Sequence, residues 1–133
     1  MNEAAKIELV KHVYEAFAKR DIPRLLGYLT DDVKWELPVI EGLALWGHRR
    51  GRDQVAEFFR QQGELQEERR FHPQEFFAQG DKVVVMGYYE WTVKATGSSF
   101  ACDWVHVFSL AGQHIDKFKE YTDTNQVARA YQP

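Results

Sequence analysis

Two titratable side chains in the C-terminal third of the chain are of the types needed for proton transfer. His106 lies in a run of apolar and aromatic residues, and Asp123 follows the last predicted strand. Histidine exchanges protons near neutral pH, and an apolar cavity raises the pKa of a carboxyl group towards that range. On neighbouring strands, the two would form a general acid–base pair. Each also has a structural interpretation: Asp123 as the N-cap of a last helix, and His106 as a hydrogen-bonded core residue.

Aromatic residues make up 14% of the chain, enough to line a ligand cavity. Trp35 and Leu37 have the same parity on one predicted strand, so both should face the same side of a sheet. Each ring taken alone is best explained by core packing, but together they would suit a flat, apolar ligand. We predict that the cavity is lined by Tyr14, Phe17, Trp35, Leu37 and Phe59, with Trp46 covering its mouth.

Composition and motif content argue against several functional classes. The net charge of -3 does not favour nucleic-acid binding, and the longest aliphatic run, Val83–Met86, is too short to span a bilayer. The histidines and carboxylates show no metal-binding spacing, and no phosphate-binding glycine motif occurs. We therefore expect no metal and no cofactor. The single cysteine, Cys102, and a charged N-terminal segment without a signal-peptide core lead us to expect a cytoplasmic protein.

Hydrophobic periodicity and turn residues give the order of elements that must position these side chains. The predicted helices are Asn2–Lys19, a short helix capped by Asp21, a helix opened by Gly51–Asp53 and stopped by Gly63, and Thr124–Tyr131. The predicted strands are Val33–Leu37, Phe71–Ala78, Lys82–Lys94, Phe100–Leu110 and His114–Thr122. Between them we expect a turn at Thr30–Asp32, an irregular loop at Val39–Arg50 and a solvated connection at Glu64–Arg70.

Early helices followed by a late run of hairpin-linked strands predict an α+β fold. We expect one domain over residues 1–133, built on a cone-like, curved antiparallel (mixed) sheet. Three helices from the N-terminal half should pack on its concave face, with a short helix at the C-terminus. The ligand cavity would lie between these helices and the sheet.

Three stretches of the sequence resemble the SnoaL-like family of the nuclear transport factor 2-like superfamily, which includes ketosteroid isomerases and polyketide cyclases. They are YEAFAKRDIPRLLGYLTDDVKWELP, the segment GRDQVAEFF after a Trp-Gly loop, and VHVFSLAGQHIDKFKEYTD. The resemblance covers nearly the whole chain and implies the conical fold. It says less about the reaction, because this fold carries both enzymes and non-catalytic binders.

The resemblance also assigns roles to individual positions. The ketosteroid isomerase base falls on Leu37, its helix-1 tyrosine falls one residue from Tyr14, and its protonated aspartate falls on Trp104. We therefore reject ketosteroid isomerisation by that family's residues. The same comparison turns Trp104 and His106 towards the cavity, and Asp123 matches the acid–base residue of the SnoaL-type cyclases. Tyr121, in the same closing segment, is a further ligand-binding candidate.

Two functions remain open at this stage. In the first, an enzyme without a cofactor binds a small, apolar, cyclic molecule and catalyses cyclisation, isomerisation, hydration or elimination through Asp123 and His106. In the second, the same fold is a non-catalytic ligand-binding or dimerisation domain in which Asp123 only caps a helix. The strands carry apolar residues on both faces, so we also expect a homodimer formed through the sheet.

Overall fold

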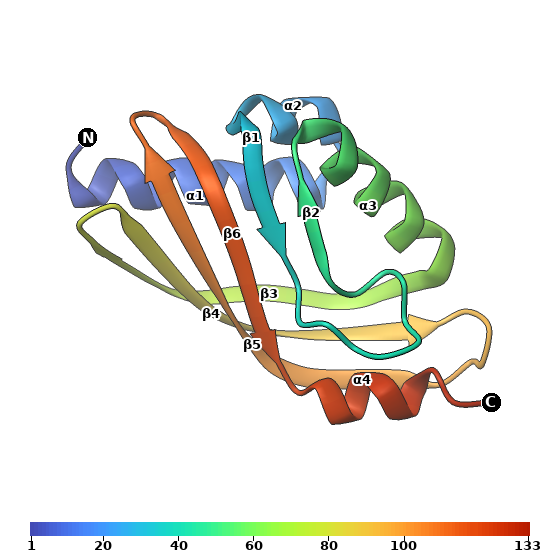
Figure 1. The fold of residues 1–133 in the computed structure, drawn as a ribbon. Helices are drawn as coiled ribbons and strands as arrows, with labels where there is room; N and C mark the ends of the chain where they lie inside the picture. The colour runs from blue at the N-terminus through green and yellow to red at the C-terminus, as the bar shows by residue number, and fades with distance from the viewer.

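The computed structural model describes residues 1–133 as a curved six-stranded sheet and four helices (Figure 1). The strand order is β2-β1-β6-β5-β4-β3. The helices are α1 (Glu3–Ala18), α2 (Ile22–Gly27), α3 (Arg52–Leu65) and α4 (Thr124–Ala130). The strands are β1 (Leu29–Glu36), β2 (His48–Arg50), β3 (Gln66–Gln79), β4 (Lys82–Val93), β5 (Ser99–Ala111) and β6 (His114–Thr122).

The predicted α+β architecture with a mixed sheet is confirmed. Strands β3 to β6 form an antiparallel series, whereas β1 runs parallel to β6. Helices α1, α2 and α3 lie together on one side of the sheet, and α4 lies beside β5 at its other end (Figure 1). The space between the three helices and the concave sheet is therefore closed on most sides.

Side-chain caps begin three of the helices. Asn2 accepts a hydrogen bond from the Ala5 amide, and Asp21 accepts one from the Arg24 amide. Such caps satisfy backbone N–H groups that have no partner inside the helix. Asp123 does the same for α4, so its predicted capping interpretation holds geometrically.

Three local expectations were wrong. The predicted turn at Thr30–Asp32 belongs to β1, because Leu29 is fully buried and pairs with Ile115 of β6. The predicted loop contains the three-residue strand β2, which pairs with β1. The predicted solvated connection at Glu64–Arg70 does not exist, because α3 runs directly into β3. The charged residues Glu67–Arg70 lie on the edge strand of the sheet, where such side chains discourage pairing with other chains.

The concave face of the sheet is apolar and regular. On β5 the inward residues are Phe100, Cys102, Trp104, His106 and Phe108, all buried, as their shared parity predicts. Opposite Trp104, β4 carries Gly87, where a Cβ atom would overlap both the indole ring and the backbone oxygen of His72. The glycine lets the Trp104 ring lie flat against the backbone.

None of the four helices combines the length and apolar character needed to cross a bilayer.

Candidate functional site

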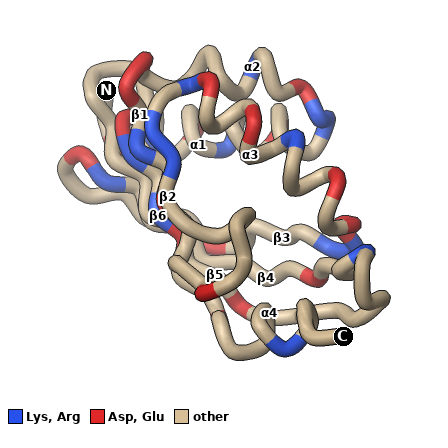
Figure 2. The backbone as a smooth tube through the Cα atoms, turned by 45° about the vertical axis from the view of Figure 1, so that its right-hand side comes forward, with Lys and Arg blue, Asp and Glu red and all other residues tan.

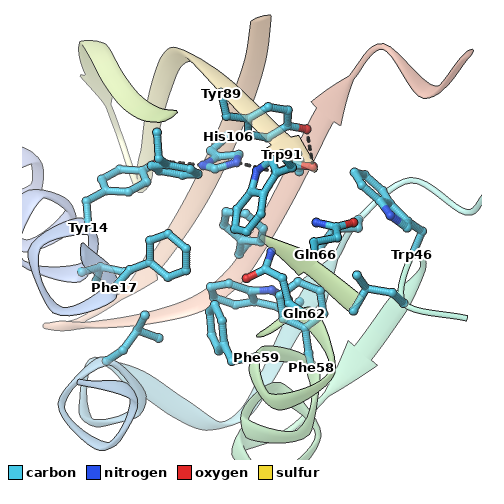
Figure 3. A pocket seen from close by; sticks show the side chains of 18 of the residues that line it. Tyr14, Phe17, Trp46, Phe58, Phe59, Gln62, Gln66, Tyr89, Trp91 and His106 are labelled. Atoms are coloured by element: carbon cyan, nitrogen blue, oxygen red, sulfur yellow. Dashed lines mark hydrogen bonds and ion pairs between the residues drawn. The ribbon is translucent and has the colours of Figure 1, made fainter. Parts of the chain in front are cut away.

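A cavity of about 60 Å³ lies between the three N-terminal-half helices and the concave sheet (Figure 3). Most of its wall is apolar. The polar side chains on the wall are Tyr14, Gln62, Gln66, Tyr89, His106 and Glu120. This composition, a few polar groups among aromatic rings, is typical of a small-molecule site.

Stacked rings build the wall and fix its polar members. Trp35 stacks on Phe118 with ring centroids 4.0 Å apart, and Trp104 stacks on the His106 imidazole at 3.9 Å. Tyr14 also lies parallel to the imidazole, at 5.9 Å. Dense aromatic packing leaves these side chains little rotamer freedom. The imidazole is therefore held in one orientation by its neighbours.

Tyr14, His106 and Glu120 form a continuous hydrogen-bonded chain from α1 to β6. The Tyr14 Oη atom is 2.7 Å from His106 Nδ1, and His106 Nε2 is 2.8 Å from Glu120 Oε1. A neutral imidazole donates through one nitrogen and accepts through the other. Because an ionised carboxylate can only accept, Nε2 carries the proton and donates to Glu120, and the Tyr14 hydroxyl donates to Nδ1.

Burial sets the protonation of this chain. Desolvation lowers the pKa of His106 below its ordinary value, although the hydrogen bond and charge of Glu120 oppose the shift. Desolvation also raises the pKa of Tyr14 well above its ordinary value, and the nearby Glu120 charge adds to this. At neutral pH the chain therefore holds a neutral imidazole and a protonated phenol, which is an arrangement that can accept one proton.

His106 has no free nitrogen, so it reaches a ligand only through its neighbours. Both ring nitrogens are already bonded, one to Tyr14 and one to Glu120. Tyr14 keeps unused lone pairs on Oη, and it lines the cavity. Tyr14 is thus the group that can touch a ligand, and His106 acts behind it.

The cavity includes most of the residues predicted from the sequence. The predicted residues found on the wall are Tyr14, Phe17, Trp35, Leu37, Trp46, Phe59 and His106. Trp104 does not line the cavity; it is buried behind His106 and supports that ring. Leu37 is buried at the wall, so no carboxylate stands where a ketosteroid isomerase would have its base.

Two further predicted residues, Asp123 and Tyr121, lie outside the cavity. Asp123 is exposed, and its carboxylate accepts hydrogen bonds from the backbone and side-chain amides of Gln126. These bonds lower the pKa of Asp123, which makes it a poor proton donor. Tyr121 is 50% exposed, because its parity on β6 turns it to the outer face. The expected Asp123–His106 pair is therefore wrong in geometry.

The carboxylate beside His106 is Glu120, which the sequence reasoning missed. Glu120 pairs directly with His106 in the β5–β6 register and is 7% exposed. The alternation of residues along β6 could have indicated that Glu120 faces inward, because it shares a face of the strand with the apolar Phe118. Counting back from the turn would nevertheless have placed Lys119 opposite His106, because a register shift between Ser109 and Leu110 moves the β5–β6 pairing by one residue.

A second pocket of about 340 Å³, the entrance pocket, adjoins the cavity where α3 ends and β3 begins. The two share Phe17, Phe59, Gln62, Gln66 and Trp91. Acidic and basic residues lie next to each other around this end of the molecule (Figure 2). The entrance pocket is therefore a polar approach to an apolar interior.

Arg20 closes one side of the entrance pocket. It follows α1 in a left-handed backbone conformation, with φ of 56°. Its guanidinium lies over the Phe17 ring at 4.3 Å, and its Nη2 is 3.2 Å from Glu68 Oε1 on β3. The side chain thus ties the end of α1 to the edge strand.

Residues 10–118 match the family described as the SnoaL-like domain. The chain belongs to this family. This match confirms the resemblance noted from the sequence, and the conical fold agrees with it. A comparison with curated proteins gives no match.

Solved structures resemble this SnoaL-like domain over its whole length. An NTF2-like protein from Burkholderia xenovorans is 30% identical, with a TM-score of 0.91 over 99% of both chains. An NTF2-like protein from Burkholderia pseudomallei is also 30% identical, with a TM-score of 0.89 over 100% of both chains. TerC, co-crystallised with polyporic acid, is 28% identical, with a TM-score of 0.82 over 95% of this chain and 97% of TerC.

Proposed function

We propose that the cavity binds a small, largely apolar, ring-containing molecule and that Tyr14 moves a proton to or from it. One observation carries the proposal: a hydrogen-bonded Tyr14–His106–Glu120 chain opens onto an aromatic cavity. A nucleophile or acid backed by a histidine, which is in turn oriented by a carboxylate, is a recurring arrangement in acid–base enzymes. The proposed reactions are cyclisation, isomerisation, hydration or elimination, without a cofactor.

The proton movement can be written out along the chain. A ligand group gives its proton to Tyr14 Oη while the phenolic proton passes to His106 Nδ1. The imidazole becomes an imidazolium, which donates to Tyr14 on one side and to the Glu120 carboxylate on the other. That negative charge stabilises the cation in a site that excludes water. The reverse sequence returns a proton to another ligand atom.

Other wall residues would position the ligand. Trp35 has a buried indole N–H without a hydrogen-bond partner, which is available to an acceptor oxygen. Gln62 and Gln66 carry amide groups at the junction with the entrance pocket. Asp123 has no part in this proposal, since it caps α4 away from the cavity.

The relative TerC supplies a first probe, because it was crystallised with polyporic acid. We expect polyporic acid to bind this chain and to quench the fluorescence of the wall tryptophans Trp35, Trp46 and Trp91. Tyr14→Phe should weaken binding by roughly tenfold through loss of one hydrogen bond to the ligand. Tyr28→Phe is the matched control, because it removes a hydroxyl that contacts Arg24 outside the cavity. Equal affinity of both variants would refute direct contact by Tyr14.

Catalysis needs a separate test, because a non-catalytic binder would share the cavity. The closed hydrogen bonding of His106 is the observation that favours this alternative. In D₂O, an acid–base site should exchange an acidic ligand proton for deuterium, which mass spectrometry detects over a panel of ring ketones and quinones. Tyr14→Phe should abolish the incorporation, whereas Tyr28→Phe should retain it. A ligand that binds but never exchanges would support the binder.

We also propose a homodimer formed through the outer face of the sheet. Val84, Met86, Tyr88, Val105 and Val107 leave this face only half-buried in the single chain. A second copy would cover these apolar side chains. Sedimentation as a monomer at micromolar concentration would contradict the dimer. The free, buried Cys102 supports our placement of the protein in the cytoplasm.

A further inference from the structure

The hydrogen-bonded chain does not end at Glu120. The second carboxylate oxygen, Oε2, is 3.2 Å from the Tyr89 hydroxyl, which is 2.8 Å from Thr122 Oγ1. Thr122 Oγ1 in turn lies 3.4 Å from Cys102 Sγ and 3.4 Å from the Asp103 backbone oxygen. Polar atoms therefore run without a break from Tyr14 in the cavity to the end of β6.

Beyond Thr122 lies a pocket of about 430 Å³ that we call the outer pocket. Its wall consists of Tyr88, Ala101, Cys102, Asp103, Asp123 and Gln126. None of these residues lines the ligand cavity. Thr122 contacts two wall residues of the outer pocket, Cys102 and Asp103, so the chain reaches the wall of a different opening.

The sheet topology explains why a buried polar chain can reach this opening. β6 pairs with β5 only as far as Thr122, opposite Trp104. After that residue the backbone turns into α4, so the first residues of β5 have no β6 neighbour on this side. The gap in the sheet lies beside Cys102 and Asp103, and the half-buried Thr122 is at its edge.

We propose that Tyr89 and Thr122 form a proton path between the His106–Glu120 pair and water in the outer pocket. The path would let the relay exchange a proton with water beyond the end of β6 while a ligand fills the cavity. This inference rests on the proposed acid–base function and deepens it. Tyr89 and Thr122 are positioning residues, since neither needs to touch the ligand.

The transfer balances in two stages. First, His106 Nδ1 receives a proton through Tyr14, and the Nε2 proton passes to Glu120, which becomes a neutral carboxylic acid. Second, the carboxyl group turns its protonated oxygen to Tyr89 and gives it that proton, Tyr89 passes its own proton to Thr122, and Thr122 passes its own to a water molecule. Each hydroxyl gains one proton and loses one, so one proton leaves the cavity and the remaining imidazole proton now lies on Nδ1. The reverse steps, in which Glu120 takes up one proton from the outer pocket and passes it to Nε2 while Nδ1 returns its proton through Tyr14 to the ligand, restore the starting state.

The charged and titratable groups along the path suit this role. Burial raises the pKa of Tyr89 well above its ordinary value, so the phenol relays a proton without standing ionised. Burial also raises the pKa of Cys102, which keeps the thiol neutral. At the open end, the exposed carboxylates of Asp103 and Asp123 attract the released proton. Tyr14, His106 and Glu120 face the inner end.

The test is the rate at which the His106 imidazole N–H exchanges with water, followed by NMR on histidine-labelled protein, free and with saturating polyporic acid. Thr122→Val removes the path hydroxyl, whereas Thr122→Ser keeps it. We expect exchange to slow by about tenfold or more in Thr122→Val and in Tyr89→Phe, because each variant interrupts the chain. Thr122→Ser and the remote Tyr28→Phe should exchange at the wild-type rate.

Wild-type exchange in a folded Thr122→Val protein would overturn the proposal, since protons would then leave by the cavity mouth. The Val/Ser pair decides the question even if Tyr89→Phe does not fold. The proposed function fails by a different result: no deuterium would enter any ligand although N–H exchange still depends on Thr122. The two failures are thus separable.

Discussion

Glu120 and Asp123 are carboxylates three residues apart with opposite surroundings. Glu120 belongs to the inward-facing row of β6 and is bonded to His106 and Tyr89 in an apolar interior. Asp123 follows the end of the strand, faces solvent and caps α4. Between them the backbone changes from strand to helix, so a small shift along the chain moves a carboxylate from a candidate relay to a structural cap. A carboxylate's role here is therefore set by its position relative to the end of β6 and by the face on which its side chain lies, and not by its residue type.

The strongest way to break this contrast is to remove the inner carboxylate. Glu120→Ala removes the hydrogen-bond acceptor of the buried His106 Nε2–H group and one of the two partners of the Tyr89 hydroxyl. It also leaves a void where the side chain was. We expect a loss of about 3 kcal/mol in the free energy of unfolding, measured by urea denaturation. Deuterium incorporation into a ligand should disappear as well. A change below about 1 kcal/mol would show that water replaces the carboxylate.

A change behind His106 tests whether the inner site depends on rigid packing. In Gly87→Ala the new methyl group would overlap the Trp104 ring and the His72 carbonyl. We expect a loss of about 2 kcal/mol in the same urea assay, because overpacking forces the ring away from the strand. Gly63→Ala is the control, since a Cβ atom there meets nothing within 4 Å. Equal stability of both proteins would contradict the tight contact.

Removing the outer carboxylate should have the smaller effect. Asp123→Ala loses the N-cap of α4 and should cost about 1 kcal/mol in unfolding free energy. Asp123→Asn keeps a capping oxygen and should cost less. Neither change should alter polyporic acid affinity, measured by fluorescence titration, because Asp123 does not line the cavity. A large loss of affinity in Asp123→Asn would return this residue to the site.

Acid titration should separate the two regions by pH, with the mildest effect. The unfolded chain protonates His106 below about pH 6.5, but the folded chain resists until a lower pH because burial lowers the pKa of His106. The unfolded state then binds more protons, so stability falls as the pH drops below about 6.5. The lowered pKa of Asp123 makes the free energy of unfolding depend on pH only below about pH 3.8. There, protonation of the carboxylate removes the cap of α4. Urea midpoints between pH 7 and 5 check this, and His106→Gln should flatten the slope.

Much of the fold could be predicted because local signals agreed with one another. Caps, turn glycines and strand parity gave the three-helix layer, the hairpin series and the inward face of β5. The starts of β1 and β3 were missed because tertiary pairing, and not local composition, holds Leu29 and Glu67–Arg70 in the sheet. The lining residues were found through parity and helix spacing.

The family resemblance pointed to Asp123 as the partner of His106, whereas the β5–β6 register places Glu120 opposite it. Whether a carboxylate at a strand end turns inward depends on the residue at which the strand stops, and sequence patterns fix such boundaries least well. The Thr122 contacts depend on the same boundary, so no pattern in the sequence pointed to them. Only the hydrogen-bond register of β5 and β6 places these side chains.

The small size of the inner cavity governs how fast a ligand can enter. An apolar cavity of roughly 150 Å³ binds a single benzene ring, whereas this one has about 60 Å³. The five side chains shared with the entrance pocket must therefore swing apart before a ring can pass. Binding should follow a gated scheme, in which the observed association rate levels off as ligand concentration rises. Affinity would then report the energy of opening as much as the complementarity of the closed site.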